Sequence, residues 1–290
     1  MISALLVKEL REKSGAGMMD AKKALLETDG DLEAAQDWLR TKGLLKAEKK
    51  SSRVAADGLV GVRVHENEGM MIELNSETDF VATNKEFIDL VDLILDHGFG
   101  ITDKDKLLNK SVSGKNIQEI INNKIATIGE NISLRRVISI KGSNIYFYLH
   151  NSVSKDCGKI GVLVSLEGNK DEDFGKKLAM HIAATSPLSM SESDLDADLV
   201  DREKKIISEQ LISEGKPADI AEKILSGKLK KFYEENTLLN QKFVMDPDSS
   251  ISQVLEKNNQ VLINFVRFKV GEGINKKESD FATEVKDIVN

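Results

Sequence analysis

Cysteine, proline and aromatic residues are all scarce in this chain. Of its 290 residues, one is cysteine (Cys157), three are proline and 5% are aromatic. A single cysteine excludes an intrachain disulfide framework and a cysteine-rich metal site, and it fits a reduced, cytoplasmic compartment. The low proline and aromatic content favours long helices with modest sheets.

Long apolar runs are also absent from the sequence. No stretch approaches the roughly 18 consecutive apolar residues that a membrane-spanning helix needs. The N-terminal run from Met1 to Arg11 is interrupted by charges, which is unlike a secretory signal peptide. We therefore expect neither a membrane span nor a signal peptide.

Neither sign of charge dominates the sequence. Acidic side chains outnumber basic ones by 48 to 41, which gives a net charge of −7. This balance argues against nucleic acid or an anionic membrane as the main partner, because both attract basic surfaces. The 40% hydrophobic composition is sufficient for two or three compact units with buried cores.

Residues 1–54 predict a three-helix unit followed by a linker. The first helix ends at Gly15–Gly17, the second covers Met18 to Glu27, and Asp31 is a natural N-cap for the third. Gly43 is expected to end the third helix, because glycine is common just beyond a helix C-terminus. The charged stretch from Lys46 to Arg53 then predicts a linker. A unit of this size is similar to ubiquitin-associated (UBA) domains, which are small helical docking modules.

An internal repeat fills most of the remaining chain and predicts an α+β fold. Each copy has two strand-like segments followed by a helix-like segment, and the residues that lead the two helices, Phe87 and Phe174, stand 87 positions apart. We expect two related subdomains, at 55–140 and 141–276, each a small antiparallel sheet packed by helices. The first also contains an amphipathic helix at 117–128 and a strand at 132–140.

The apolar pattern becomes helical over about 195–236, inside the second subdomain. Two helical stretches flank Gly215-Lys216-Pro217, a helix stop followed by a helix start, so we expect a protruding antiparallel helical hairpin. Beyond it the pattern predicts a loop at 240–247, a strand at 260–270 and a C-terminal helical module at 277–290.

The segment from Asn75 to Ala82 joins a strand-like run to a helix-like run and places an acidic residue, Asp79, beside a bulky aromatic, Phe80. Two interpretations are open. In the first, Thr78 caps the following helix and Phe80 fills the local core. In the second, Asp79 and Phe80 protrude and disturb the site of a partner. The segment has no nucleophile, catalytic carboxylate pair or phosphate-binding loop around it.

Five short motifs occur in a fixed order along the chain: Val7–Arg11 with Gly15–Asp20, Thr78–Ala82, Ala179–Ala184, Phe243–Met245 and Gly271–Ile274. In this order and spacing, together with the repeat and the hairpin, they resemble bacterial elongation factor Ts. The resemblance covers nearly the whole chain. That family supplies the nucleotide exchange factor of the GTPase elongation factor Tu.

The resemblance implies a guanine nucleotide exchange factor of translation elongation, without a chemical active site, cofactor or metal of its own. It implies that the turn formed by Thr78, Asp79, Phe80 and Val81 inserts near the Mg²⁺ site of the GTPase. Phe80 would wedge between apolar side chains there, and Asp79 would form a bond. Displaced magnesium ligands would then loosen the bound nucleotide.

The resemblance also implies partner contacts outside this turn. The residues concerned are Arg11, Met18, Met19, His181, Val244 and Met245. The first three would contact a surface helix of the GTPase domain, His181 its phosphate-binding loop region, and the last two its C-terminal β-domain. From the residues alone, Met18 and Met19 point about 100° apart on a helix, so one of them is expected to be exposed. From the residues alone, the position of His181 in an apolar helix favours a hydrogen-bonded core histidine.

Two alternatives from other classes stay open. A non-catalytic adaptor would bind partners through the UBA-like module and the hairpin. An enzyme would use Asp79 and Glu77 as metal ligands, although two neighbouring carboxylates seldom bind magnesium tightly. The oligomeric state is also open, with a homodimer or a 2:2 complex with elongation factor Tu among the options. Ser279–Ala282 imitates the earlier turn, but no strand leads into it, so we expect helix capping there.

Overall fold

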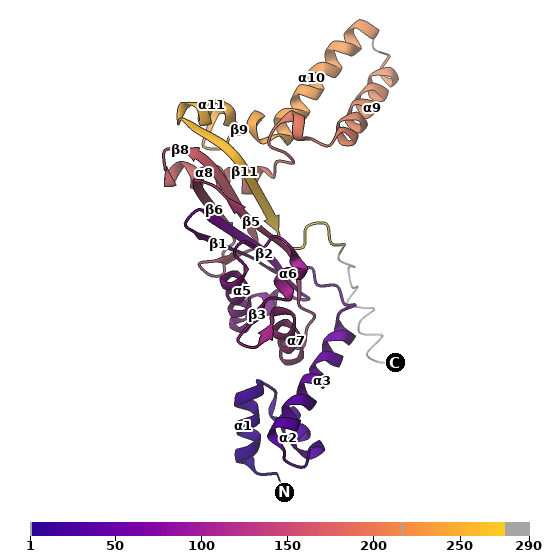
Figure 1. Cartoon of the computed structure of the whole chain (residues 1–290). Helices are drawn as coiled ribbons and strands as arrows, with labels where there is room; N and C mark the ends of the chain where they lie inside the picture. Colours follow the sequence, from indigo (N-terminus) through magenta and orange to yellow (C-terminus); the bar gives the residue numbers. More distant parts are fainter. Residues whose placement is uncertain (1, 216, 276–290) are drawn as a thin grey trace.

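The chain is described by a computed structural model that covers residues 2–215 and 217–275. The C-terminal helical module predicted at 277–290, including Ser279–Ala282, lies outside the described residues. Figure 1 shows three parts in space: N-terminal helices at one end, two small sheets with their helices in the middle, and a pair of long helices at the other end. In the described residues, no helix is both long and apolar enough to cross a membrane.

The N-terminal part consists of α1 (Ala4–Ser14), α2 (Met18–Glu27) and α3 (Leu32–Lys50). Gly15 ends α1 in the left-handed region, at φ 70°, where glycine lacks the Cβ clash of other residues. The predicted cap of α3 is confirmed, because the Asp31 carboxylate accepts hydrogen bonds from the N–H groups of Glu33 and Ala34. The core between the three helices is made by Leu10, Ala21, Ala24, Leu25 and Ala35.

The prediction that the third helix ends at Gly43 is wrong, because α3 continues to Lys50 and includes most of the predicted linker. Gly43 is buried inside the helix, and a Cβ at this position would lie 3.6 Å from the Cβ of Ala126 in α7 (Ile117–Ile128). Gly43 therefore lies where α3 packs against α7, with room for one methyl group, and does not end the helix. In the local sequence, a glycine that ends a helix looks the same as a glycine at a helix–helix contact.

The first sheet is antiparallel, with strand order β5-β2-β1-β7. Its strands are β1 (Asp57–His65), β2 (Glu68–Ser76), β5 (Ser133–Lys141) and β7 (Cys157–Gly158). Between β2 and β5 the chain forms four helices and two short strands. They are α4 (Asp79–Ala82), α5 (Lys85–Gly98), α6 (Lys104–Leu108), β3 (Ser111–Val112), β4 (Lys115–Asn116) and α7. Gly61 lets α5 approach closely, because a Cβ there would lie 2.5 Å from Val91.

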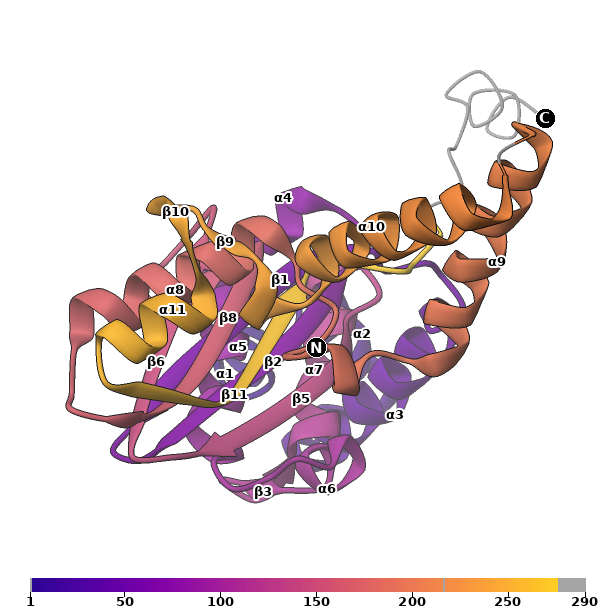
Figure 2. The ribbon, with the colours of Figure 1, turned by 90° about the horizontal axis from the view of Figure 1, so that it is seen from above.

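The second sheet has the order β11-β8-β6, built from β6 (Asn144–His150), β8 (Ile160–Gly168) and β11 (Gln260–Lys269). Helix α8 (Glu172–Thr185) packs on β6 and β8, and α11 (Ile251–Lys257) on β11 (Figure 2). The two sheets share a buried apolar layer that includes Val60 and Met71 of the first and Leu163 and Phe268 of the second. The predicted mixture of helices and small antiparallel sheets is therefore confirmed.

A buried charge ties the two sheets together beside β2. The carboxylate of Glu73 is inaccessible to solvent and pairs with Arg135 and Arg136 at 3.1 and 2.6 Å. It also accepts a hydrogen bond from the N–H of Gly271, 2.8 Å away, just beyond the end of β11. Because a buried carboxylate needs several such partners, this cluster fixes the strand that leads to the Asp79–Phe80 turn.

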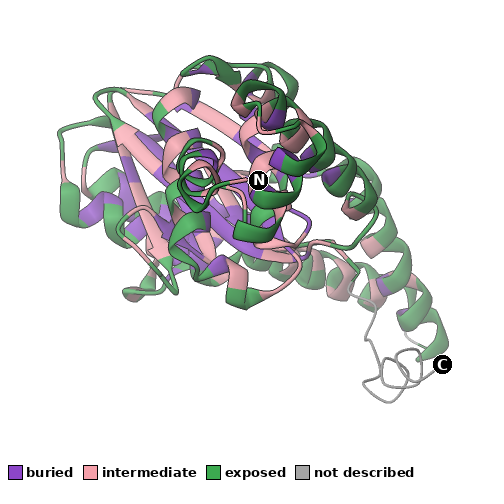
Figure 3. Cartoon of the chain, turned by 90° about the horizontal axis from the view of Figure 1, so that it is seen from below, coloured by how far each residue is buried: buried purple, intermediate pink, exposed green. Residues whose placement is uncertain are grey.

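Helices α9 (Ala197–Ser213) and α10 (Ala218–Asn236) extend away from the sheets in Figures 1 and 2. Val200, Ile207 and Leu211 of α9 are buried, whereas no described residue of α10 is. Figure 3 shows the contrast: buried positions are concentrated in the sheets and the helices beside them, and the two long helices are mostly exposed.

The loop predicted at 240–247 is wrong in part, because β9 (Lys242–Phe243) pairs with β10 (Asp246–Ser250) in this region. The 3-10 turn η2 (Leu238–Asn240) precedes them, and another, η1 (Glu192–Asp194), precedes α9. Phe243 is buried with its ring 6.5 Å from that of Phe174. Burial of Phe243 in the core favours an ordered hairpin. The local sequence has a single apolar run and therefore does not show that two strands pair there.

Candidate functional site

The four residues of α4 divide between the core and the solvent. Ala82 is fully buried and Val81 packs against the core cluster, whereas Asp79 is exposed and 83% of Phe80 is accessible to solvent. Thr78 caps α4, since its hydroxyl accepts a hydrogen bond from the N–H of Val81 at 3.5 Å. The expected cap is thus confirmed, but the interpretation that Phe80 fills the local core is wrong.

The carboxylate of Glu130, a residue that the sequence analysis did not predict to matter, binds the backbone and the capping hydroxyl of this turn. One carboxylate oxygen accepts hydrogen bonds from the N–H groups of Glu77 and Thr78 at 3.1 and 3.0 Å. The other accepts from the Thr78 hydroxyl at 2.6 Å. Glu130 lies 52 positions from Thr78 in the sequence, just after α7, so no local spacing connects the two residues.

Glu77 in turn binds the segment that carries Glu130. Its carboxylate accepts a hydrogen bond from the N–H of Asn131 at 2.6 Å and pairs with Arg53 at 3.6 Å. The enzyme alternative, with Asp79 and Glu77 as metal ligands, therefore has one carboxylate already engaged by protein groups. Across residues 2–215 and 217–275, no group of three or more histidine, cysteine, aspartate or glutamate side chains is placed to hold a metal ion.

His181 lies in the core of the free chain, with 1% of its surface exposed. Its Nε2 is 3.0 Å from the Gln241 Oε1, and its Nδ1 accepts a hydrogen bond from the N–H of Val244 at 3.3 Å. This arrangement needs a neutral ring protonated on Nε2. Burial lowers the pKa of His181, and the bond to Gln241 opposes that shift only in part. The hydrogen-bonded core histidine is thus the arrangement of the free chain, and contact with a partner stays a prediction.

Val244 and Met245 form the turn between β9 and β10. Both are about half exposed, at 50% and 45%, although the adjacent Phe243 is buried against the His181 ring, 5.7 Å away. The turn therefore presents two apolar side chains at the surface from a hairpin that is anchored to the core. Exposed apolar side chains held in this manner are typical of protein-docking surfaces.

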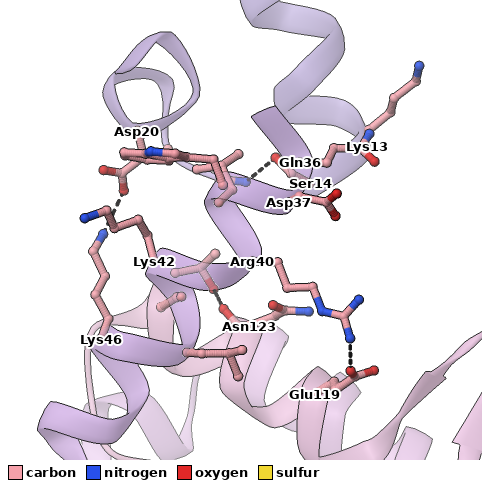
Figure 4. A pocket seen from close by; sticks show the side chains of 18 of the residues that line it. Lys13, Ser14, Asp20, Gln36, Asp37, Arg40, Lys42, Lys46, Glu119 and Asn123 are labelled. Atoms are coloured by element: carbon pink, nitrogen blue, oxygen red, sulfur yellow. Dashed lines mark hydrogen bonds and ion pairs between the residues drawn. The ribbon is translucent and has the colours of Figure 1, made fainter. Parts of the chain in front are cut away.

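Met18 and Met19 begin α2, and both are exposed, by 60% and 74%, whereas the sequence required only one. Arg11 of α1 is also exposed. Figure 4 shows the neighbouring pocket of about 320 Å³ where α3 meets α7. There Arg40 pairs with Glu119, and across the N-terminal helices Lys46 pairs with Asp20 at 3.0 Å. The Lys46–Asp20 pair joins α3 to α2, whereas the Arg40–Glu119 pair joins α3 to α7, the helix that Glu130 follows.

The predicted site residues do not form one cluster. The structure distributes them over α1 and α2, the α4 turn, α8 and the β9–β10 turn, and within the described residues the one hydrogen bond between different groups of them joins Val244 to His181. Large apolar side chains are thus exposed at three of these places on ordered elements, which is typical of a protein that docks on another protein.

Comparison with known proteins gives the family. The family model described as elongation factor TS matches residues 77–272, which begin at the α4 turn and end just beyond β11. Elongation factor Ts of Paracoccus denitrificans is 53% identical over 287 residues, covering 98% of this chain and 97% of that protein. Elongation factor Ts of Dinoroseobacter shibae is 50% identical over 289 residues, covering 100% and 99%. The chain belongs to the elongation factor Ts family.

Proposed function

We propose that this chain is the guanine nucleotide exchange factor of elongation factor Tu and acts in translation elongation in the cytoplasm. Family membership supports the partner and the process. The observation that carries the mechanism is the exposure of Phe80, 83% accessible on a turn whose backbone is held by Glu130. An exposed aromatic on an ordered turn loses little conformational entropy when it inserts into a partner.

In the proposed mechanism, Phe80 wedges between apolar side chains beside the Mg²⁺ site of the GTPase, and Asp79 forms a bond there. The Asp79 carboxylate is exposed and has no hydrogen bond or ion pair with any described residue, so it is free to accept a partner's donor. Displacement of the magnesium ligands weakens the hold on GDP. The chain itself performs no bond-making or bond-breaking step.

The energetics require more than one contact. Antagonism between factor and nucleotide is a reciprocal coupling free energy, and a 10⁴-fold change in affinity corresponds to about 5.5 kcal/mol. Burial of one phenylalanine supplies about 1.5–3 kcal/mol. We therefore infer that contacts elsewhere hold the factor in place while Phe80 distorts the nucleotide site.

Two exposed surfaces flank the wedge and suit this holding role. At one end, Arg11, Met18 and Met19 would dock on a surface helix of the GTPase domain, with α1–α3 acting as a UBA-like module. At the other, Val244 and Met245 would dock on the C-terminal β-domain of the partner. His181 would contribute through the β9–β10 turn that it supports, close to the phosphate-binding side of the GTPase.

The proposed domain division follows the repeat: a UBA-like unit and linker at 1–54, subdomains at 55–140 and 141–276, and a helical module at 277–290. Helices α9 and α10 would form an antiparallel arm inserted in the second subdomain. We propose no direct contact with nucleic acid or membrane. A homodimer or a 2:2 complex with elongation factor Tu is compatible with this division.

The test is the release of a fluorescent GDP analogue from elongation factor Tu. Substoichiometric amounts of the chain should accelerate release and turn over repeatedly. Binding to elongation factor Tu without faster release would favour the adaptor alternative instead.

A further inference from the structure

We propose that Glu130 is a positioning residue for exchange, which holds the Asp79–Phe80 turn in the orientation that enters the partner. The inference rests on the proposed function of that turn. Glu130 itself is half-buried beneath the turn and does not need to touch the partner.

The first argument is where the backbone loses its sheet partners. The pairing of β2 with β1 ends at Ser76, and its pairing with β5 ends at Asn75. The next two N–H groups, those of Glu77 and Thr78, both donate to the Glu130 carboxylate. Glu130 therefore replaces the missing strand at the point where the chain leaves the sheet, with charge-assisted bonds that are stronger than those between neutral groups.

The second argument is the double role of the Thr78 hydroxyl. It donates to the Glu130 carboxylate at 2.6 Å and accepts from the N–H of Val81, so the cap of α4 is itself fixed by Glu130. A helix of four residues has little stability of its own, because helix nucleation is unfavourable. The direction of Phe80 thus depends on the capping residue and on what holds it.

The third argument is that the contact is reciprocal and reaches α3. Glu77 accepts from the N–H of Asn131, while the Asn131 side-chain amide donates to the carbonyl of Arg53 at 2.8 Å. The ammonium of Lys50, in the last turn of α3, donates to the carbonyl of Gly129. Residues 129–131 therefore bind both the turn that carries Phe80 and the C-terminal end of α3. A displacement of α3 on partner binding would therefore be transmitted to Phe80 through residues 129–131.

Three single variants test the proposal in the full chain. Glu130→Ala removes all three acceptor bonds, and we expect the rate of GDP release at saturating factor to fall about tenfold, with the half-saturating concentration changed by less than about threefold. Glu130→Gln keeps one acceptor oxygen and should retain an intermediate rate. Glu86→Ala is the matched control: it removes a carboxylate that pairs with Lys124 of α7 at 2.9 Å and forms no hydrogen bond or ion pair with the described residues of the turn.

A double variant separates positioning from general loss of structure. If Glu130 acts through the wedge, Glu130→Ala should have almost no further effect on release in a Phe80→Ala background. Amide hydrogen exchange supplies a second readout: the N–H groups of Glu77 and Thr78 should exchange faster in Glu130→Ala, with β2 amides unchanged.

Additive losses in the double variant, or unchanged release despite faster exchange at Thr78, would overturn the positioning role while leaving the exchange function intact. Slow exchange at Thr78 in Glu130→Ala would overturn it as well. A wild-type chain that binds elongation factor Tu without accelerating GDP release contradicts the proposed function itself. These results are therefore distinguishable.

Discussion

His181 connects the chemistry of a single residue to the shape of a docking surface. Its neutral ring joins Gln241 to the N–H of Val244, so the exposed β9–β10 turn depends on one protonation state. Protonation of Nδ1 would place an N–H opposite the Val244 N–H and break that bond. His181, which the resemblance to the family implies as a partner contact, supports in the free chain the β9–β10 turn, where we propose another such contact.

We predict that acid destabilises the fold partly through His181. Its pKa is lower in the folded chain than in the unfolded chain, where it is about 6.5. Below about pH 6.5 the unfolded chain therefore binds more protons at this residue than the folded chain, and the free energy of unfolding falls as the pH falls. Denaturant unfolding of wild type and His181→Gln at pH 7.5 and 5.5 measures this contribution. The variant should be less stable at pH 7.5 but lose less on acidification; equal losses would contradict the assignment.

At the residue scale, the sequence left Phe80 open between a core position and a protruding one, required only one of Met18 and Met19 to be exposed, and did not point to Glu130. Local sequence could not decide the position of Phe80, because a bulky aromatic next to a capping threonine occurs both in cores and on protruding turns, and the structure leaves it 83% exposed. Glu130 acts over 52 positions of sequence through two backbone N–H groups, and an isolated glutamate after a glycine carries no sign of that role.

At the scale of elements, most helices and strands follow from apolar periodicity and caps. The amphipathic helix at 117–128, for example, coincides with α7, which begins with a capping box between Asn116 and Glu119. The failures are at Gly43 and at the β9–β10 hairpin, where tertiary packing decides the outcome. Glycine is a common helix-ending residue, but Gly43 is buried where α3 packs against α7. Only the position of α7, which local sequence does not show, distinguishes these two roles.

The packing at Gly43 leads to a prediction with opposite signs for two substitutions. Gly43→Ala should stabilise the chain by up to about 1 kcal/mol, since alanine favours helix and its Cβ would make an ordinary 3.6 Å contact with Ala126. Gly43→Leu should destabilise it, because a larger side chain would push α3 from α7. Midpoints of chemical denaturation measure both, and stabilisation by leucine would contradict this account of the helix contact.

The β9–β10 turn supports a prediction about binding. Replacing Val244 and Met245 with alanine should weaken binding to nucleotide-free elongation factor Tu by about tenfold or more, because each loses apolar surface that the complex would bury. The melting temperature should hardly change, since both side chains are half exposed.

Ile212→Ala, at the exposed end of α9, provides the matched control for that experiment. Its side chain is 76% exposed, so it tests whether any exposed apolar residue matters. The exchange-factor account expects unchanged binding. A greater loss from Ile212→Ala than from the double alanine variant would favour the adaptor alternative, in which the helical arm holds the partner.

In the proposed mechanism, separate parts of the whole molecule hold the partner and distort its nucleotide site. The N-terminal helices and the β9–β10 turn carry exposed Met19 and Met245 at a distance from each other along the fold, and Phe80 lies on a third element between them in sequence. Since burial of Phe80 alone is too weak to displace a nucleotide, affinity from the outer contacts must be converted into strain at the centre.

The decisive measurement is GDP release from elongation factor Tu together with binding, for wild type, Phe80→Ala and Met19→Ala. Phe80→Ala should lower the release rate far more than the binding affinity, because the wedge acts mainly on the nucleotide site. Met19→Ala should lower affinity more than the rate at saturation, because it belongs to a holding contact. Equal losses of rate and affinity in both variants would contradict this division of roles.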